Sequence, residues 1–186
     1  MFSSPNEYYT EEIVEKYSNS RSMRKIQEEL TIKTLNLLSI EPPAKILDLG
    51  CGVGYSTSLV KDLGFEVIGI DINSFMVRKA LEKGLNVILG DFRYLKEYFT
   101  KQSFDCVISI SALQWVKKWS DMRKVAEGIF YVLKEQGKAG IQFYPFGELE
   151  LRMFCRAFIC SGFKCKTIIE DRKSKKRTIF ILLEKK

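Results

Sequence analysis

The sequence predicts an α/β fold built on a seven-stranded, mostly parallel sheet with helices on both faces. Apolar stretches of strand length alternate with segments whose apolar residues recur at helical spacing, and this alternation is typical of a parallel sheet with right-handed crossovers. Residues 163–170 and 178–184 follow each other without a helix, so we expect a hairpin whose last strand is antiparallel. A chain of 186 residues is long enough for one domain with a full core.

Residues 1–40 are expected to be mostly helical. Thr10 followed by two glutamates is typical of a helix N-cap and first turn, which predicts a helix over residues 11–17. A break at residues 18–20 precedes a second helix over residues 21–38, which Pro42 and Pro43 end. The apolar face of this second helix consists of Ile26, Leu30, Leu37 and Leu38.

The α/β core is expected to occupy residues 45–186. Before the hairpin, strands are predicted over residues 46–49, 66–72, 85–91, 104–111 and 138–144, and helices over residues 55–63, 74–83, 93–100, 119–134 and 149–161. Gln136 and Gly137 are expected to end the helix 119–134, Pro145 the fifth strand, and Gly162 the last helix. The basic loop 171–177 could contact phosphates or simply be solvated.

Composition narrows the class of protein. Hydrophobic residues make up 46% and charged residues 28%, which are ordinary globular values. No apolar run approaches the roughly 20 residues of a membrane span, and the N-terminus lacks the pattern of a signal peptide. Five scattered cysteines without a Cys-x-x-Cys pair, and no histidine, disfavour a metal site in this chain and suit a cytoplasmic protein. A net charge of +7 suits RNA as a partner, although solubility alone would also explain it.

A glycine-rich turn follows the first strand. Gly50, Cys51, Gly52 and Gly54 lie between the strand and the next helix, where a ligand can approach the backbone and the free helix N–H groups. The dinucleotide fingerprint would place its third small residue at position 55, but here it falls on Gly54. The alternative is a tight turn without a ligand.

Polar residues follow the next strands. In doubly wound sheets, ligands bind at the carboxyl ends of strands beside the switch point, and an acid there accepts from ribose hydroxyls. Asp71 ends the second strand and Asp91 the third, and either could instead be a local cap or turn residue. The fourth strand carries Ser109 and Ser111 and leads into Gln114 and Trp115. Gln114 could hydrogen-bond a substrate, and Trp115 could stack on one or pack in the core.

The form Asp48-x-Gly-x-Gly-x-Gly54 resembles motif I of the class I S-adenosylmethionine-dependent methyltransferases. This resemblance implies S-adenosyl-L-methionine as the cofactor and residues 1–40 as a lid over its pocket. It also implies the roles of particular residues. Tyr17 and Arg21 would lie at the lid joint with Arg21 near the methionine carboxylate, Asp71 and Ile72 at the ribose, Asp91 and Phe92 at the adenine, and Ser109 near the transferable methyl group.

Beyond motif I, the chain resembles the guanine-N7 methyltransferases of small-subunit ribosomal RNA. The shared features are Pro5–Tyr9, Lys16–Arg21, Ile26-Gln27, Gly69–Ile72, Leu89–Asp91, Ile108–Trp115, Gln142–Pro145 and Lys175-Lys176. The resemblance implies small-subunit rRNA or a pre-ribosome as substrate, with Ser111, Gln114, Trp115 and Tyr144 positioning the acceptor. It also implies a small zinc-ribbon activator protein that adds a strand beside residues 86–90.

Two other functions fit the same residues. The segment Ala112–Trp115 also resembles enzymes that methylate carboxylates on small acids or carrier-protein thioesters. Neither guanine N7 nor a carboxylate requires a proton to be removed, so a chain without histidine suits both acceptors. The remaining alternative is a non-catalytic ribosome-assembly factor that keeps the cofactor pocket only as structure.

Overall fold

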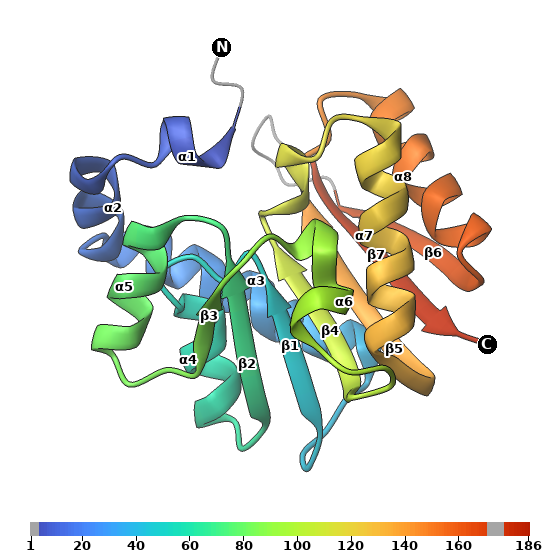
Figure 1. Cartoon of the computed structure of the whole chain (residues 1–186), viewed down its shortest axis with the longest axis horizontal. Coiled ribbons are helices and arrows are strands. Elements are labelled where there is room, and N and C mark those ends of the chain that lie inside the picture. The colour runs from blue at the N-terminus through green and yellow to red at the C-terminus, as the bar shows by residue number, and fades with distance from the viewer. Residues whose placement is uncertain (1–3, 171–176) are drawn as a thin grey trace.

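The computed structural model describes residues 4–170 and 177–186 and confirms the α/β fold (Figure 1). Its seven strands form one sheet in the order β3-β2-β1-β4-β5-β7-β6. The strands are β1 Lys45–Leu49, β2 Glu66–Asp71, β3 Val87–Leu89, β4 Phe104–Ile110, β5 Leu133–Phe143, β6 Phe163–Glu170 and β7 Thr178–Lys185. The predicted basic loop lies outside the described residues, except for Arg177.

The pairing of the strands follows the predicted topology. Strands β1 to β5 pair in parallel, and β7 is inserted antiparallel between β5 and β6. The order of the strands reverses between β1 and β4, which creates the switch point at which doubly wound sheets bind ligands. β3 and β6 are the two edges of the sheet.

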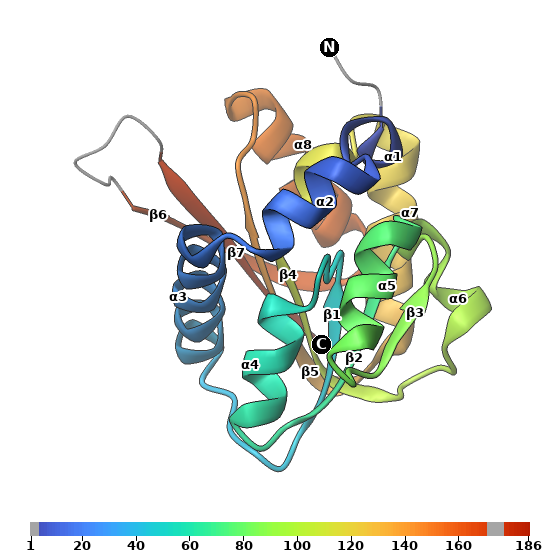
Figure 2. The same cartoon turned by 90° about the vertical axis from the view of Figure 1, so that its left-hand side faces the viewer.

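Helices cover both faces of the sheet. The α-helices are α1 Pro5–Tyr8, α2 Glu11–Ser18, α3 Arg21–Leu38, α4 Tyr55–Asp62, α5 Ser74–Glu82, α6 Leu95–Tyr98, α7 Trp119–Val132 and α8 Glu148–Cys160, with short 3₁₀ turns η1 at Phe92–Tyr94 and η2 at Leu113–Trp115. Figure 2 looks towards the β3 side and shows α3 and α7 separated by the sheet. None of the described helices is long and apolar enough to cross a membrane.

Alternating side chains of the central strands explain the two layers. Ile46 packs with α3 and α4 residues, whereas Leu47 and Leu49 join the cluster that contains Val125 and Ile129 of α7. All four residues from Ile46 to Leu49 are buried, as expected for a parallel strand with both faces covered. The sheet therefore holds the ends of β1 and β4 on a rigid, two-sided core.

Several boundaries differ from the sequence prediction. Helix α7 ends at Val132 and β5 already begins at Leu133, because Leu133 pairs with Phe104 and a register shift then absorbs residues 134–137 into the strand. Helix α1 was not predicted; Ser4 caps it and Pro5 starts it. The predicted helix 93–100 is a 3₁₀ turn followed by the single turn α6. The apolar face predicted for α3 was partly wrong, because Ile26 is exposed, whereas Leu35 is buried.

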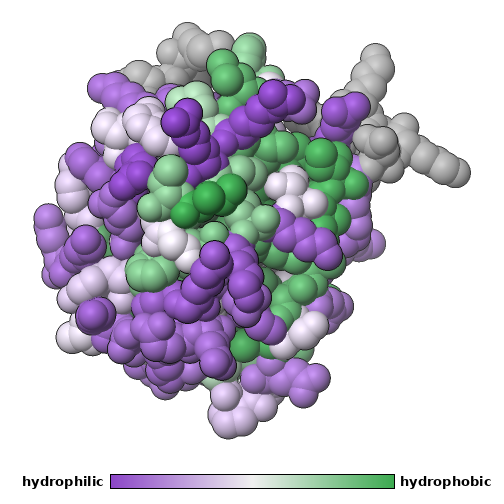
Figure 3. All heavy atoms as spheres, turned by 90° about the vertical axis from the view of Figure 1, so that its right-hand side faces the viewer, coloured by the Kyte–Doolittle hydropathy of each residue, from purple (hydrophilic) through white to green (hydrophobic). Residues whose placement is uncertain are grey.

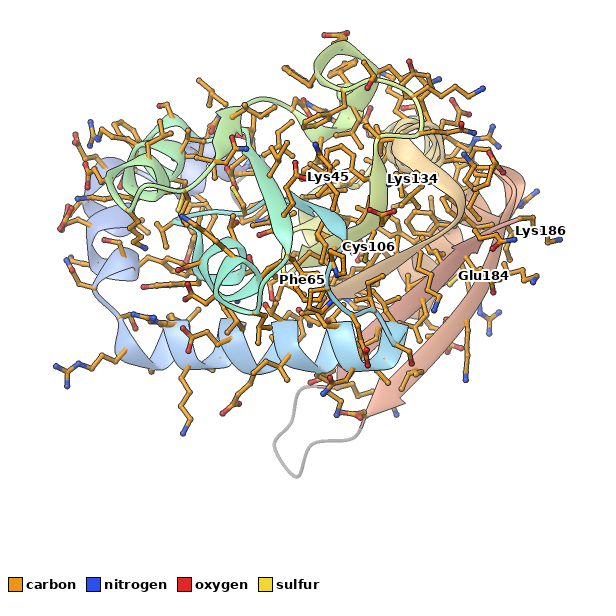
Figure 4. The ribbon with its side chains drawn as sticks, turned by 90° about the horizontal axis from the view of Figure 1, so that it is seen from below. Lys45, Phe65, Cys106, Lys134, Glu184 and Lys186 are labelled. Carbon is orange, nitrogen blue, oxygen red and sulfur yellow. The ribbon has the colours of Figure 1, made fainter. Side chains whose placement is uncertain are left out.

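The amino-terminal end of the sheet is closed by polar contacts. Lys45 at the start of β1 donates its backbone N–H to Asp105, and Lys134 in β5 forms an ion pair with the same carboxylate at 2.7 Å. Figure 4 shows Lys45 and Lys134 in the view from below, together with Cys106 of β4. The opposite, carboxyl end of the sheet carries the main cavity.

Candidate functional site

A cavity of about 550 Å³ lies at the carboxyl ends of β1, β2, β4 and β5, and Pro5 and Asn6 of α1 line it. The structure brings most of the predicted site residues together at its wall. These are Tyr17, Gly50, Cys51, Gly52, Asp71, Ile72, Asp91, Phe92, Ser111, Gln114, Trp115 and Tyr144. They come from six separate stretches of the chain, which the fold brings to the same end of the sheet.

Three predicted residues do not line the cavity. Arg21 is exposed at the start of α3. Ser109 is fully buried within β4, where its hydroxyl donates to the carbonyl of Leu49, and it does not line the cavity. Gly54 packs against α5, and a Cβ there would lie 2.3 Å from Leu85. Its role is to let the turn approach the neighbouring layer.

The glycine-rich turn is held in a conformation that favours glycine. Gly50, Gly52 and Gly54 have φ angles of +72°, +55° and +82°. A Cβ on Gly50 would lie 2.3 Å from the Cβ of Ala112, so this turn and the segment after β4 are in close contact. A Cβ on Gly52 would meet nothing nearer than the sulfur of Met76 at 3.8 Å. Gly52 therefore leaves space beside the backbone on the cavity wall.

Asp71 links this turn to the end of β2. One carboxylate oxygen accepts the N–H of Gly52 at 2.8 Å, and the other accepts the N–H of Asn73 at 2.9 Å. Burial raises the pKa of Asp71, and the backbone N–H bonds oppose that rise. A carboxylate has about four acceptor positions, so Asp71 can still accept from two hydroxyl groups of a ligand.

Asp48 lies behind the turn and does not line the cavity. It is fully buried, and its Oδ2 accepts the hydroxyls of Ser56 at 2.5 Å and Thr57 at 2.7 Å in the first turn of α4. Its Oδ1 has no partner, and desolvation raises the pKa of Asp48 to about 6. Asp48 therefore fastens α4 to β1 and positions the turn from behind.

A charged cluster at the wall was not predicted. Arg93 donates to both carboxylate oxygens of Asp91, and its remaining guanidinium nitrogen donates to Asp121 of α7 at 3.2 Å. These hydrogen bonds raise the pKa of Arg93 further above its usual range. Asp121 lies thirty residues away from Asp91 in the sequence, and no local pattern marks the pair.

Aromatic side chains from the N-terminal segment close one side of the cavity. Tyr9 contacts Trp115 with ring centroids 6.0 Å apart, and Tyr17 contacts Tyr55 at 5.7 Å. Asn73 donates to the backbone carbonyl of Tyr9 at 2.9 Å, which fixes the segment between α1 and α2 over β2. Burial raises the pKa of Tyr9 to about 12, so the phenol stays neutral at pH 7. In the sequence, Tyr9 stands out only as part of the family motif Pro5–Tyr9.

The opposite wall carries an amide with one free acceptor. Gln114 donates its Nε2 to the backbone carbonyl of Ser111 at 2.5 Å, which sets the orientation of the amide. Its Oε1 is buried, has no hydrogen-bond partner and belongs to a cavity-lining residue. A buried acceptor without a partner is costly, and a ligand N–H at this wall would satisfy it.

Comparison with known proteins agrees with this fold and cavity. A family profile described as a methyltransferase domain matches residues 47–141, and one for protein-L-isoaspartate(D-aspartate) O-methyltransferase matches residues 5–87. A Pyrococcus horikoshii protein of known structure has a TM-score of 0.75 at 23% identity, covering 91% of this chain and 93% of its own. A SAM-dependent methyltransferase from Archaeoglobus fulgidus has a TM-score of 0.74 at 18% identity, covering 92% and 97%. The fold and site are those of a class I S-adenosylmethionine-dependent methyltransferase.

Curated relatives narrow the family. The 18S rRNA (guanine-N(7))-methyltransferase of Schizosaccharomyces pombe is 30% identical over 96% of this chain and 70% of its own length. The enzyme of the same name from Bos taurus is 32% identical over 96% of this chain and 67% of its own length. The chain belongs to the family of the 18S rRNA (guanine-N(7))-methyltransferases.

The cavity residues fit S-adenosyl-L-methionine. Gly52 leaves room beside the turn, Asp71 keeps acceptor positions for the two ribose hydroxyls, and aromatic rings suit a cationic sulfonium. When bound, this cofactor supplies an electrophilic methyl group. In the part of the chain that the structure describes, no cluster of acidic or cysteine side chains could hold a metal ion.

Proposed function

We propose that this methyltransferase transfers a methyl group to guanine N7 in small-subunit ribosomal RNA. The observation that supports it most directly is the near-full-length similarity to proteins that carry this activity in their names. The net charge of +7 suits an RNA substrate.

Guanine N7 has a free lone pair, so the transfer needs no general base. The protein's work is then to hold the acceptor in line with the methyl group and to exclude water. Trp115 and Tyr144 would bound the acceptor space, and Ser111 would hold the turn after β4 through its hydroxyl bond to Gln142. The chain has no histidine, and burial keeps Tyr9 neutral, which suits an acceptor that loses no proton.

Gln114 is the residue we assign to recognition of the guanine. Its unpartnered Oε1 can accept from the N–H groups of guanine, which presents both a ring N–H and an amino group. A Gln114→Met variant keeps the length of the side chain and removes the acceptor. We expect it to lose acceptor methylation at least tenfold, about 1.4 kcal/mol, with unchanged affinity for the cofactor.

We assign the cofactor to the other walls of the cavity, with residues 1–40 as its lid. Tyr17, Gly50, Cys51 and Gly52 would surround the methionine end, Asp71 and Ile72 the ribose, and Asp91 and Phe92 the adenine. Arg21 and Ser109 are left out of this assignment because neither lines the cavity. The five cysteines are free thiols, which supports our placing of the protein in the cytoplasm.

We also propose that a small zinc-ribbon activator protein adds a strand to β3. β3 is an edge strand, and Leu89 within it is 54% exposed. Val87 is 7% exposed and packs against α5, so a charge there would disturb the core. The informative variant is Leu89→Glu, with Ile159→Glu on α8 as the control because Ile159 is 58% exposed far from this edge.

Only Leu89→Glu should abolish co-purification with the activator. Equal co-purification of both variants would remove the edge-strand assignment and leave the methyltransferase assignment intact.

The test of the whole proposal is transfer of tritium from labelled S-adenosyl-L-methionine to purified small ribosomal subunits, with and without the co-expressed activator. Label in 7-methylguanosine after digestion of the RNA is the expected result. Label in free or carrier-bound carboxylic acids, without label in RNA, would favour a carboxylate O-methyltransferase. An assembly factor would be favoured if the wild-type protein labels no acceptor and the Asp71→Ala variant still associates with RNA.

A further inference from the structure

An aromatic side chain is exposed to solvent close in the sequence to a residue of the cavity wall. Phe146 is 89% exposed, and it follows the cavity-lining residue Tyr144 by two positions in the loop between β5 and α8. Figure 3 shows the α8 and β6 side of the molecule, where apolar side chains interrupt a hydrophilic surface. Exposed apolar side chains that form a contiguous patch mark an interaction site.

The loop that carries Phe146 is fixed to the acceptor wall. Glu150 of α8 accepts the backbone N–H of Phe146 at 2.6 Å and the ammonium of Lys117 at 2.7 Å. Lys117 follows the segment of Gln114 and Trp115 that lines the cavity. The Glu150 side chain is only 12% exposed, whereas that of Lys117 is 58% exposed, so the carboxylate is held against the protein surface while its ammonium partner faces solvent. Glu150 therefore links the backbone at Phe146 to Lys117, next to the segment that lines the cavity.

Cationic and aromatic groups follow Lys117 along the chain. Lys117 and Lys118 are exposed, and Trp119 at the start of α7 is 38% exposed with the guanidinium of Arg156 5.9 Å from its ring. An exposed ring beside ammonium and guanidinium groups offers a stacking surface for a base and positive charge for its phosphate. This combination is how proteins bind unpaired RNA.

We propose that Phe146 stacks on the nucleobase adjacent to the methylated one, an inference that rests on the proposed RNA substrate. A base that enters the cavity must leave its stack, which uncovers the face of its neighbour. Stacking of that neighbour on Phe146 compensates for the lost base–base contact and sets the register of the RNA over the cavity. The ligand of this subsite is thus a base of single-stranded or locally opened RNA.

The test measures methyl transfer to small subunits by Phe146→Ala, Phe146→Leu and Phe146→Trp in the complex with the activator. We expect Phe146→Ala to raise KM for the RNA about tenfold, about 1.4 kcal/mol, with the affinity for the cofactor unchanged. Phe146→Leu should have a KM for the RNA as high as that of the alanine variant, whereas Phe146→Trp should keep the wild-type KM. Ile159→Ala, which shortens an exposed apolar side chain on α8, is the control and should match the wild type.

A wild-type KM for Phe146→Ala would overturn this proposal alone, because the wild-type protein would still methylate RNA. Full rescue by leucine would also overturn it, since a general apolar contact would then suffice. Loss of a co-purifying protein from Phe146→Ala with an unchanged KM would assign the ring to a protein contact instead. If the wild-type protein labels only carboxylic acids, the proposed function and this subsite fall together.

Discussion

Replacing Gly50 with alanine tests how closely the glycine-rich turn approaches the segment after β4. An L residue at φ +72° costs roughly 1–2 kcal/mol, and the new Cβ would lie 2.3 Å from the Cβ of Ala112. Neither Cβ can move without its backbone, and overpacking of this kind costs about 1–3 kcal/mol. We therefore expect a loss of roughly 2–5 kcal/mol in the free energy of unfolding, measured by denaturant titration.

Gly52→Ala is the matched control for Gly50→Ala. Its φ of +55° carries a similar conformational cost, but the nearest atom to its Cβ is the Met76 sulfur at 3.8 Å, an ordinary contact. We expect roughly 1–2 kcal/mol of destabilisation here, together with weaker cofactor binding because the methyl group occupies cavity space.

The double variant Gly50→Ala with Ala112→Gly removes the overlap and keeps the positive φ. It should show a coupling free energy of about 1–3 kcal/mol in a double-mutant cycle. Additive effects, or equal destabilisation by Gly50→Ala and Gly52→Ala, would refute the assignment of the cost to this close contact.

The remaining predictions concern the acids and the tryptophan at the site. Asp71→Ala should abolish cofactor binding in calorimetry, because Gly52 and Asn73 lose their acceptor along with the ligand; normal activity in this variant would contradict the cofactor assignment. The pKa of Asp48 is raised to about 6, so folding favours its protonated form. This preference adds about 3 kcal/mol to the free energy of unfolding below pH 4, and that contribution is lost as pH rises to about 6. Asp48→Asn should therefore gain stability relative to the wild type as pH rises from 4 to 7 in urea titrations, and parallel pH profiles would show that Asp48 is not the cause. Trp115→Ala should lower kcat by more than it weakens cofactor binding, since Trp115 bounds the acceptor space; an equal loss of both would place it at the cofactor instead.

The strands and most helices could be predicted because their signals are local. Helix α3 was predicted with the bounds Arg21–Leu38 that the structure shows, from its spacing and the prolines after it. The boundary between α7 and β5 was wrong because pairing of Leu133 with Phe104 overrides the local helical pattern. Gln136 has a φ of +61°, and its local sequence does not distinguish a turn within an extended strand from the end of a helix.

For the site, position in the chain determined which strand ends carry acids, but not which side chains reach the cavity. Ser109 and Ser111 are two residues apart, so in a continuous strand both side chains would point to the same face of the sheet. However, β4 ends at Ile110, and only Ser111 lines the cavity. Chain order also cannot reveal the contact of Arg93 with Asp121, because it depends on how α7 packs over η1.

The sequence by itself determined the class of fold, the glycine-rich turn and the acids at the ends of β2 and β3. These features depend on the periodicity of apolar residues and on neighbouring residues, both of which are given by the amino-acid order. Only the tertiary structure decided that Leu89 is exposed while Val87 is buried and that Gln114 keeps an unpaired acceptor. It also decided that Glu150 accepts the backbone N–H of Phe146. Each of these depends on which distant elements pack together, and burial and pairing are properties of that packing.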